Sequence, residues 1–313
     1  MSNPDSLITL TKIRELDLSV ATSSGQHLHL SAASGLVRAD PYIYVVADDE
    51  LHLGEFALTD TKPGHLIRLF EGELPASRPK RKKRKPDLET LMRLPAFAGY
   101  PYGALFALGS GGKPNRRLGA LLALNAQGAV IGTARVVDLA NMLAALDDDV
   151  TGLNIEGGIV RGDEFCLLHR GNKSTGRNAL IWFHLLPLLE MLGSQDGMGR
   201  IAPFAILPVD LGSVAGVALG FTDGAALPNG DIVFSAVAEK RDDNYNDGPC
   251  VGAALGILNK AGNLRCLHRL DQAHKIEGVD ARVDGGVIRL LLVTDADDAN
   301  IAASLYSAAL PAE

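Results

Sequence analysis

The hydrophobic pattern of this chain repeats one theme, in which a short apolar stretch follows a turn and ends in polar residues. Five such stretches read as β-strands because they are short and bounded by turn residues. A second strand-like stretch follows each one, and NAQG (125–128) and NKAG (259–262) read as hairpin turns. The five stretches are YIYVVA (42–47), GALFALG (103–109), EFCLLH (164–169), DIVFSAV (231–237) and VIRLLLV (287–293).

A polar or small residue, often followed by glycine, opens each unit of this pattern. The opening residues are Ser34, Glu89, Glu156, Ala215 and Glu277, with spacings of 55 to 67 residues. Each unit contains about four strand-like stretches, which is the content of one propeller blade. We therefore expect an all-β fold, a single β-propeller of four-stranded blades, with five blades preferred and six as the alternative. A set of unrelated hairpins in another β-protein is the competing interpretation.

We expect the propeller to span residues 1–313 as one domain. The N-terminal stretch LITLTKIRELDL (7–18) alternates apolar and polar residues and belongs to no unit of its own. It is predicted to complete the last blade beside ASLYSAALP (303–311), because such a closure removes exposed strand edges. Short helices are predicted only in loops, at 135–146 and 187–193.

Composition and charge argue against a nucleic-acid-binding, a disulfide-rich and a membrane-spanning protein. Hydrophobic residues make up 47% of the chain, which is ample for a core, and the net charge of -7 argues against nucleic-acid binding. The three cysteines are too few and too scattered for a disulfide framework or a CxxC metal site. The most apolar stretch, 179–193, is too short for a membrane span and contains His184 and Glu190. We expect a cytoplasmic protein with no membrane or nucleic-acid partner, and the oligomeric state stays open.

Several short motifs carry a family resemblance. NIEGG (154–158), KIEGVD (275–280) and the strand exits HRGN (169–172) and TDADD (294–298) resemble an uncharacterised bacterial β-propeller family. That family is distantly similar to the phytase-like esterase-activity propellers. The five-fold count is also similar to the calcium-activated nucleotidases, which place acidic residues at the start of inner strands. The resemblance implies a fold, and it implies no common activity.

The opening residues of the units are expected to meet at the propeller axis. Three of them are carboxylates, Glu89, Glu156 and Glu277, which would repel one another unless a cation, shared protons or water compensates. Calcium or another divalent cation is the predicted cofactor, because calcium accepts many oxygen ligands in flexible geometry. The alternative is structural, with each carboxylate accepting hydrogen bonds from turn N–H groups.

The polar residues that follow the apolar strands are expected to form a second ring on one face. The residues that follow the strands of units two and three are mainly basic, and those of the neighbouring units are mainly acidic. This pattern suits a small anionic ligand beside a metal ion. Solvated loops that pair with each other would show the same pattern. The residues predicted to bind a ligand are Arg116, Arg170, Asn172, Lys173 and Glu239. His169 and Asp295 are the candidates for proton transfer.

Two functional classes follow from these predictions. One is a non-catalytic propeller that binds a small anionic ligand or a metal ion on one face or at the axis. The other is a metal-dependent hydrolase such as a phosphoesterase or lactonase. No GxSxG, HExxH or GxGxxG motif is present, and ALGSGGKPN (107–115) lacks the P-loop spacing, so no nucleotide cofactor is expected.

Two charged stretches are interpreted as ordinary loops. RPKRKKRKPD (78–87) is bounded by prolines and has no aromatic residue on which bases could stack, so we predict an inter-blade loop. RDDNYNDG (241–248) is similar to a calcium loop, but its glycine comes one place late and no bidentate glutamate follows at the required distance.

Overall fold

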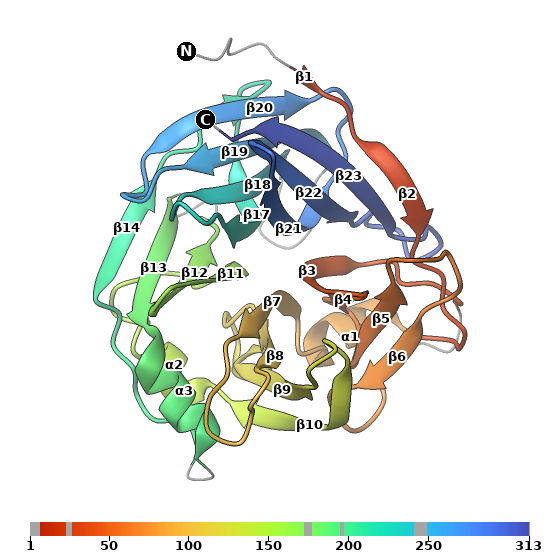
Figure 1. Ribbon diagram of the computed structural model, residues 1–313, viewed down its shortest axis with the longest axis vertical. Coiled ribbons are helices and arrows are strands. Elements are labelled where there is room, and N and C mark those ends of the chain that lie inside the picture. Colours follow the sequence, from red (N-terminus) through yellow and green to blue (C-terminus); the bar gives the residue numbers. More distant parts are fainter. Residues whose placement is uncertain (1–6, 23–26, 172–176, 195–196, 241–248, 313) are drawn as a thin grey trace.

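Five antiparallel sheets of four strands are arranged in a ring around a common axis in the computed structural model (Figure 1). The structure describes residues 7–22, 27–171, 177–194, 197–240 and 249–312. The predicted five-bladed β-propeller is therefore confirmed. Short polar turns join consecutive strands, and NAQG and NKAG form hairpin turns as predicted, each closed by a hydrogen bond between the flanking backbones.

Each blade uses four strands in chain order from the axis outward, except that the last blade takes its outer strand from the N-terminus. Blade 1 contains β3 (Ala33–Ala39), β4 (Tyr42–Ala47), β5 (His52–Ala57) and β6 (His65–Arg68). Blade 2 contains β7 (Leu88–Leu94), β8 (Ala104–Gly109), β9 (Leu118–Leu124) and β10 (Val130–Asp138). Blade 3 contains β11 (Ile155–Arg161), β12 (Glu164–His169), β13 (Asn178–His184) and β14 (Ala205–Val209).

The ring closes through the N-terminal segment. Blade 4 contains β17 (Gly220–Ala226), β18 (Ile232–Glu239), β19 (Cys250–Leu258) and β20 (Leu264–Leu270), and β1 (Leu7–Ile8) pairs with β20 in parallel. Blade 5 contains β21 (Ile276–Asp284), β22 (Val287–Thr294), β23 (Ser304–Pro311) and β2 (Thr11–Glu15), with β2 antiparallel to β23. The N-terminal segment thus covers the outer edges of two neighbouring blades, which leaves fewer unpaired backbone groups at the rim.

The hydrophobic core consists of five clusters, each between two adjacent blades. In blades 1 to 4 the second strand packs on both faces, so YIYVVA and ALFALG are almost wholly buried and show no polar alternation. In blade 5 the second strand leaves Arg289 exposed. Two of these clusters contain a pair of buried phenylalanines. Phe165 stacks on Phe183 between blades 2 and 3, and Phe221 meets Phe234 edge to face between blades 3 and 4.

Helices are confined to connections between strands or blades. They are α1 (Arg78–Arg84), α2 (Ala140–Ala144), α3 (Leu185–Gly193) and the 3-10 turn η1 (Pro114–Arg116). The helix predicted at 135–146 is shorter than expected because its first residues extend β10, while α3 confirms the second predicted helix. None of the helices in the described ranges is long and apolar enough to cross a membrane.

Candidate functional site at the propeller axis

A β-bulge near the start of every inner strand marks the equivalent positions of the five blades. The register of β3, β7, β11, β17 and β21 against the next strand shifts by one residue at this point. A bulge leaves its extra residue outside the ladder and re-aims its side chain. The bulged residues are Ser34, Glu89, Glu156, Thr222 and Glu277.

The predicted opening residue of the fourth unit, Ala215, is wrong. Ala215 adopts a left-handed conformation (φ 51°) in the small hairpin of β15 (Ser213–Val214) and β16 (Val217–Ala218), ahead of the inner strand. The equivalent residue is Thr222, whose hydroxyl lies 2.7 Å from that of Ser235. The pattern of a polar or small residue before glycine did not reveal it, because Thr222 is followed by Asp223 rather than by glycine.

The glycine after the bulge explains the repeated Glu-Gly and Ser-Gly pairs of the sequence. A Cβ atom at Gly35 would lie 3.0 Å from the backbone nitrogen of Leu91, and one at Gly278 would lie 3.0 Å from that of Leu36. Each contact joins neighbouring inner strands, so glycine permits a close approach of two backbones at the axis.

The three glutamates of the bulges are brought into one electrostatic neighbourhood, as predicted. Burial, with the charges of Asp87, Glu156 and Asp48, raises the pKa of Glu89 well above its usual value. Burial is also the first cause that raises the pKa of Glu277 to about 8, and the charge of Glu156 adds to it. Both shifts express the cost of placing negative charges close together away from water.

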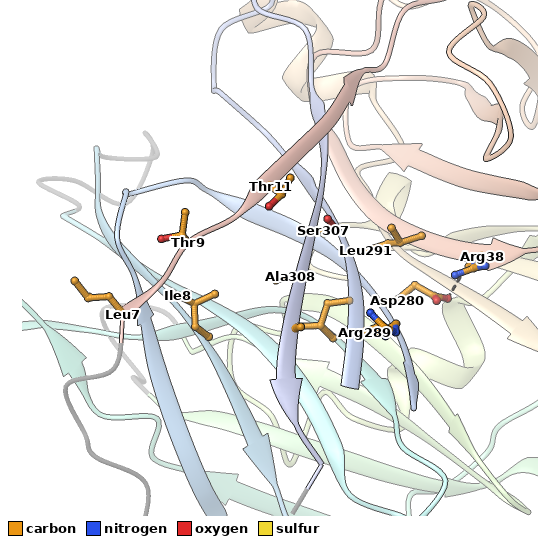
Figure 2. A pocket seen from close by; sticks show the side chains of 12 residues that line it. Leu7, Ile8, Thr9, Thr11, Arg38, Asp280, Arg289, Leu291, Ser307 and Ala308 are labelled. Atoms are coloured by element: carbon orange, nitrogen blue, oxygen red, sulfur yellow. Dashed lines mark hydrogen bonds between the residues drawn. The ribbon is translucent and has the colours of Figure 1, made fainter. Parts of the chain in front are cut away.

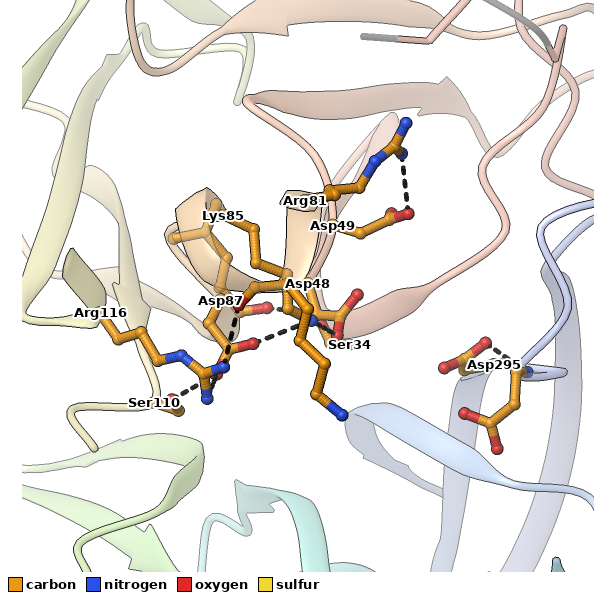
Figure 3. A network of polar contacts seen from close by, with 12 residues as sticks. Ser34, Asp48, Asp49, Arg81, Lys85, Asp87, Ser110, Arg116 and Asp295 are labelled. Atoms are coloured by element: carbon orange, nitrogen blue, oxygen red, sulfur yellow. Dashed lines mark hydrogen bonds and ion pairs between the residues drawn. The ribbon is translucent and has the colours of Figure 1, made fainter. Parts of the chain in front are cut away.

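A first group of ion pairs joins blades 1 and 2 (Figure 3). The Lys85 ammonium contacts the carboxylate of Asp48 and lies 2.9 Å from Asp87 Oδ1. Arg116 Nη1 lies 2.6 Å from Asp87 Oδ2, and the Ser110 hydroxyl donates to the same oxygen. These partners lower the pKa of Asp87 despite its burial.

A second group of ion pairs runs from blade 3 through blade 4 to blade 5. Arg170 Nη1 lies 3.6 Å from Glu156 Oε2, and Arg170 Nη2 lies 2.7 Å from Glu239 Oε2. The Lys275 ammonium lies 3.5 Å from Glu239 and 3.3 Å from Glu277. It also lies 3.6 Å from Asp295 and 2.9 Å from Asp297. The burial of Asp295 raises the pKa of this carboxyl to about 7, despite the nearby lysine.

We call the two groups, together with Glu89, the axial cluster. Within the described residues it contains eight carboxyl groups but only four basic side chains, so its carboxyl groups outnumber their possible counter-ions. The carboxylates belong to Asp48, Asp87, Glu89, Glu156, Glu239, Glu277, Asp295 and Asp297, and the basic groups to Lys85, Arg116, Arg170 and Lys275.

Three carboxylates of the cluster could hold one cation. Asp48, Asp87 and Glu89 each offer an oxygen, and these oxygens lie within 4.8 Å of one another. Among the residues that the structure describes, Glu89 forms no hydrogen bond or ion pair of its own, although its charge interacts with several neighbours. Its carboxylate is therefore the group of this trio that is available to a ligand.

The residues predicted to transfer protons lie on two different blades of the cluster. His169 is buried at the end of β12, where its Nδ1 accepts a hydrogen bond from the backbone N–H of Asn154 at 3.2 Å, and burial lowers its pKa. Asp295 follows β22, and its backbone forms a bridge to Ala32 of blade 1. Their proposed chemical roles stay predictions.

The residues predicted to bind an anionic ligand have other partners in the structure. Arg116 is paired with Asp87, and Arg170 is paired with Glu239, itself one of the predicted ligand residues. Asn172 and Lys173 lie outside the described residues, as does the 241–248 stretch. The described guanidinium groups thus balance carboxylates of the protein itself.

Three important residues were missed by the sequence interpretation. Lys85 and Asp87 belong to the basic run that was read as a loop, and Lys275 opens the KIEGVD motif. A signal existed in the spacing, because Asp87 and Lys275 each stand two places before a bulged glutamate, directly ahead of an inner strand. Asn154 has the same spacing from Glu156 and donates a hydrogen bond to it.

A separate pocket of about 600 Å³ lies at the rim, on blade 5 (Figure 2). Thr11 and Ser307 line its outer part, and Asp280 and Arg38 lie at its inner part. The Asp280 carboxylate accepts a hydrogen bond from the backbone N–H of Arg38 at 3.0 Å, which ties β21 to β3. These polar groups belong to the seam between blades 5 and 1, so the axial cluster remains the stronger candidate site.

Solved structures similar to the chain share little sequence with it. The chain is 9% identical to hydrazine synthase of Kuenenia stuttgartiensis (TM-score 0.37), covering 100% of this chain and 64% of that one. It is 7% identical to the α-L-arabinofuranosidase Arb93A of Fusarium graminearum (TM-score 0.45; 96% and 98%). It is 9% identical to a glycosyl hydrolase of Bacteroides ovatus (TM-score 0.44; 99% and 92%). Similarities at this level assign no activity.

The family of the chain is shown by its sequence. No curated protein matches it. The similarity to phytase-like and nucleotidase-type propellers stays a prediction. The model of a family of unknown function, DUF6929, matches residues 29–310, which include all five inner strands. The chain therefore belongs to the DUF6929 family.

Proposed function

We propose that the protein is a propeller that binds a divalent cation, with calcium as the first candidate, at Asp48, Asp87 and Glu89. The observation that supports this proposal is the excess of carboxylates at the axis, with the Glu89 carboxylate unengaged by any described side chain. Burial first, and repulsion by neighbouring carboxylates second, raise the pKa of Glu89, and a hard cation with oxygen ligands would offset both.

An anionic ligand would reach this site through the cation. Arg116 and Arg170 each hold a carboxylate at hydrogen-bonding distance, so neither has its full charge available for a phosphate or carboxylate. A divalent ion bound by the trio keeps coordination positions for a second ligand. Of the three glutamates predicted to bind the metal, this trio keeps only Glu89, because Glu156 and Glu277 face Arg170 and Lys275.

Thermal denaturation tests the proposal. We expect millimolar calcium to raise the unfolding midpoint relative to chelator, because a ligand that binds only the folded state stabilises it. Glu89→Gln should lose this shift. Glu73→Gln, which removes an exposed carboxylate outside the cluster, should keep it. Equal midpoints with calcium, magnesium and chelator in the wild-type protein would remove the proposal.

A metal-dependent hydrolase is the second candidate, and one observation favours it. Burial, together with the charges of Asp297 and Asp48, raises the pKa of Asp295 to about 7. A carboxyl group with such a pKa can take or give a proton at neutral pH. A panel of phosphoesters and lactones, assayed with calcium and with Asp295→Asn as the control, tests this candidate. Turnover of no substrate in the panel would leave the binding function alone.

A further inference from the structure

The basic run 78–87 is part of the site rather than an ordinary loop. It forms α1 in the connection between β6 and β7, and most of its basic side chains are exposed to solvent. Arg81 and Lys85 are the exceptions, since both are buried. Arg81 Nη1 lies 3.1 Å from Asp49 Oδ2, and Lys85 contacts Asp48 and Asp87 (Figure 3).

The position of Lys85 is coupled to that of the helix. Lys85 is the C-terminal cap of α1, and its backbone N–H donates to the carbonyl of Arg81 at 2.8 Å. Asn115 donates from its side-chain amide to the carbonyl of Lys85 at 2.8 Å. A displacement of the Lys85 side chain from the cluster would therefore remove an ion-paired contact that holds the C-terminal end of α1.

The Lys85 ammonium uses the same carboxylates that the cation would need. Of the trio Asp48, Asp87 and Glu89, the first two are paired with Lys85 in this structure. A divalent cation and an ammonium group cannot both lie against these oxygens without strong mutual repulsion. One cation must leave when the other binds.

We propose that Lys85 is a tethered competitor of the cation, and that binding of a divalent cation expels its side chain and loosens α1. This inference rests on the proposed function. In this account Lys85 sets the concentration at which the cation binds, and the contacts of α1 change when the cation binds. A monovalent ion gains no charge by replacing an ammonium group, so the competition also selects divalent cations.

Calcium titration calorimetry of the wild-type protein and of Lys85→Met tests the first half of the inference. Removal of the competing charge should tighten calcium binding by about tenfold or more. Lys83→Met, which removes an exposed lysine of the same helix, should bind as the wild type does. Binding to all three proteins with equal affinity, or weaker binding to Lys85→Met, would overturn the inference and leave the proposed function in place. No binding to any of them would overturn both.

Limited trypsin digestion tests the second half without a variant at Lys85. If calcium loosens α1, it should accelerate trypsin cleavage of the wild-type protein within residues 80–84. Bound ligands usually have the opposite effect and slow proteolysis. Digestion of Glu89→Gln, which lacks the site, corrects for any effect of calcium on trypsin. Slower or unchanged cleavage of the wild type at saturating calcium would contradict the release of α1.

Discussion

The Nζ atom of Lys275 lies 3.3 Å from Oε1 of Glu277, two residues along the chain, and the same ammonium group faces three further carboxylates. Only 11% of the Lys275 side chain is exposed, and its carboxylate partners raise its pKa well above the usual value although partial burial lowers it. It is the basic group on which the blade 4 and blade 5 part of the axial cluster depends.

Lys275→Met should destabilise the protein by about 3–5 kcal/mol, because it leaves buried carboxylates without their counter-ion. Urea denaturation at pH 7.5 measures this. Lys62→Met is the matched control, since Lys62 pairs with Asp60 at 3.5 Å with 83% of its side chain exposed, and such surface pairs contribute about 0–1 kcal/mol. Similar losses in the two variants would show that the cluster is not held by Lys275.

The stability of the cation-free protein should fall as the pH rises from about 5 to about 8. The pKa of Glu277 is raised to about 8 and that of Asp295 to about 7, so in this window the folded state binds more protons than the unfolded state. A raised carboxyl pKa stabilises the fold at low pH, and the contribution disappears as the pH passes the folded value. The raised pKa of Lys275 acts only above its unfolded value of about 10.5.

Unfolding free energies measured in chelator across this pH range test the sign. Glu277→Gln should flatten the decline, so that this variant loses less unfolding free energy than the wild type between pH 5 and pH 8. Glu73→Gln should follow the wild-type curve. A wild-type protein that becomes more stable between pH 5 and pH 8 would contradict the account.

The sequence was sufficient for the fold because its main signals are local. Apolar strands, hairpin turns and the repeated Glu-Gly pairs all arise from contacts within a blade or between adjacent inner strands. The spacing of the five units was enough to predict that Glu89, Glu156 and Glu277 meet near the axis. The basic partners of these glutamates could not be predicted, because Lys85 and Lys275 pair with carboxylates on other blades.

The predicted start of blade 4 was wrong for a physical reason. Its bulge carries Thr222 and is preceded by a hairpin whose turn residue, Ala215, occupies a position with positive φ. The hairpin provides a small residue and a glycine in the expected order, and so it imitates the start of a unit.

Substitutions at these two positions separate the assignments. Thr222→Val should cost about 1–2 kcal/mol, because it leaves the buried Ser235 hydroxyl without its partner. Ala215→Gly should be neutral or stabilise by up to about 1 kcal/mol, since glycine adopts positive φ readily. Thermal or urea denaturation measures both. A tolerant Thr222 and a sensitive Ala215 would reverse our placement of the inner strand.

Gly278→Ala should destabilise the ring by about 1–3 kcal/mol through overpacking. The added methyl group would lie 3.0 Å from the Leu36 backbone nitrogen and 2.6 Å from Val293 Cγ2. Gly199→Ala is the control, because its methyl group would meet only the Met191 side chain, at 3.3 Å. Equal stability of Gly278→Ala and the wild type would show that the inner strands have room to separate.

The axial cation is tested most directly by diffraction from crystals soaked in manganese, whose anomalous signal locates the ion without ambiguity. We predict one anomalous peak within coordination distance of Asp48, Asp87 and Glu89, with the Lys85 side chain turned away from it, and no peak there in Glu89→Gln crystals. An axis free of anomalous density, with Lys85 still against Asp48 and Asp87 at saturating manganese, would contradict the account.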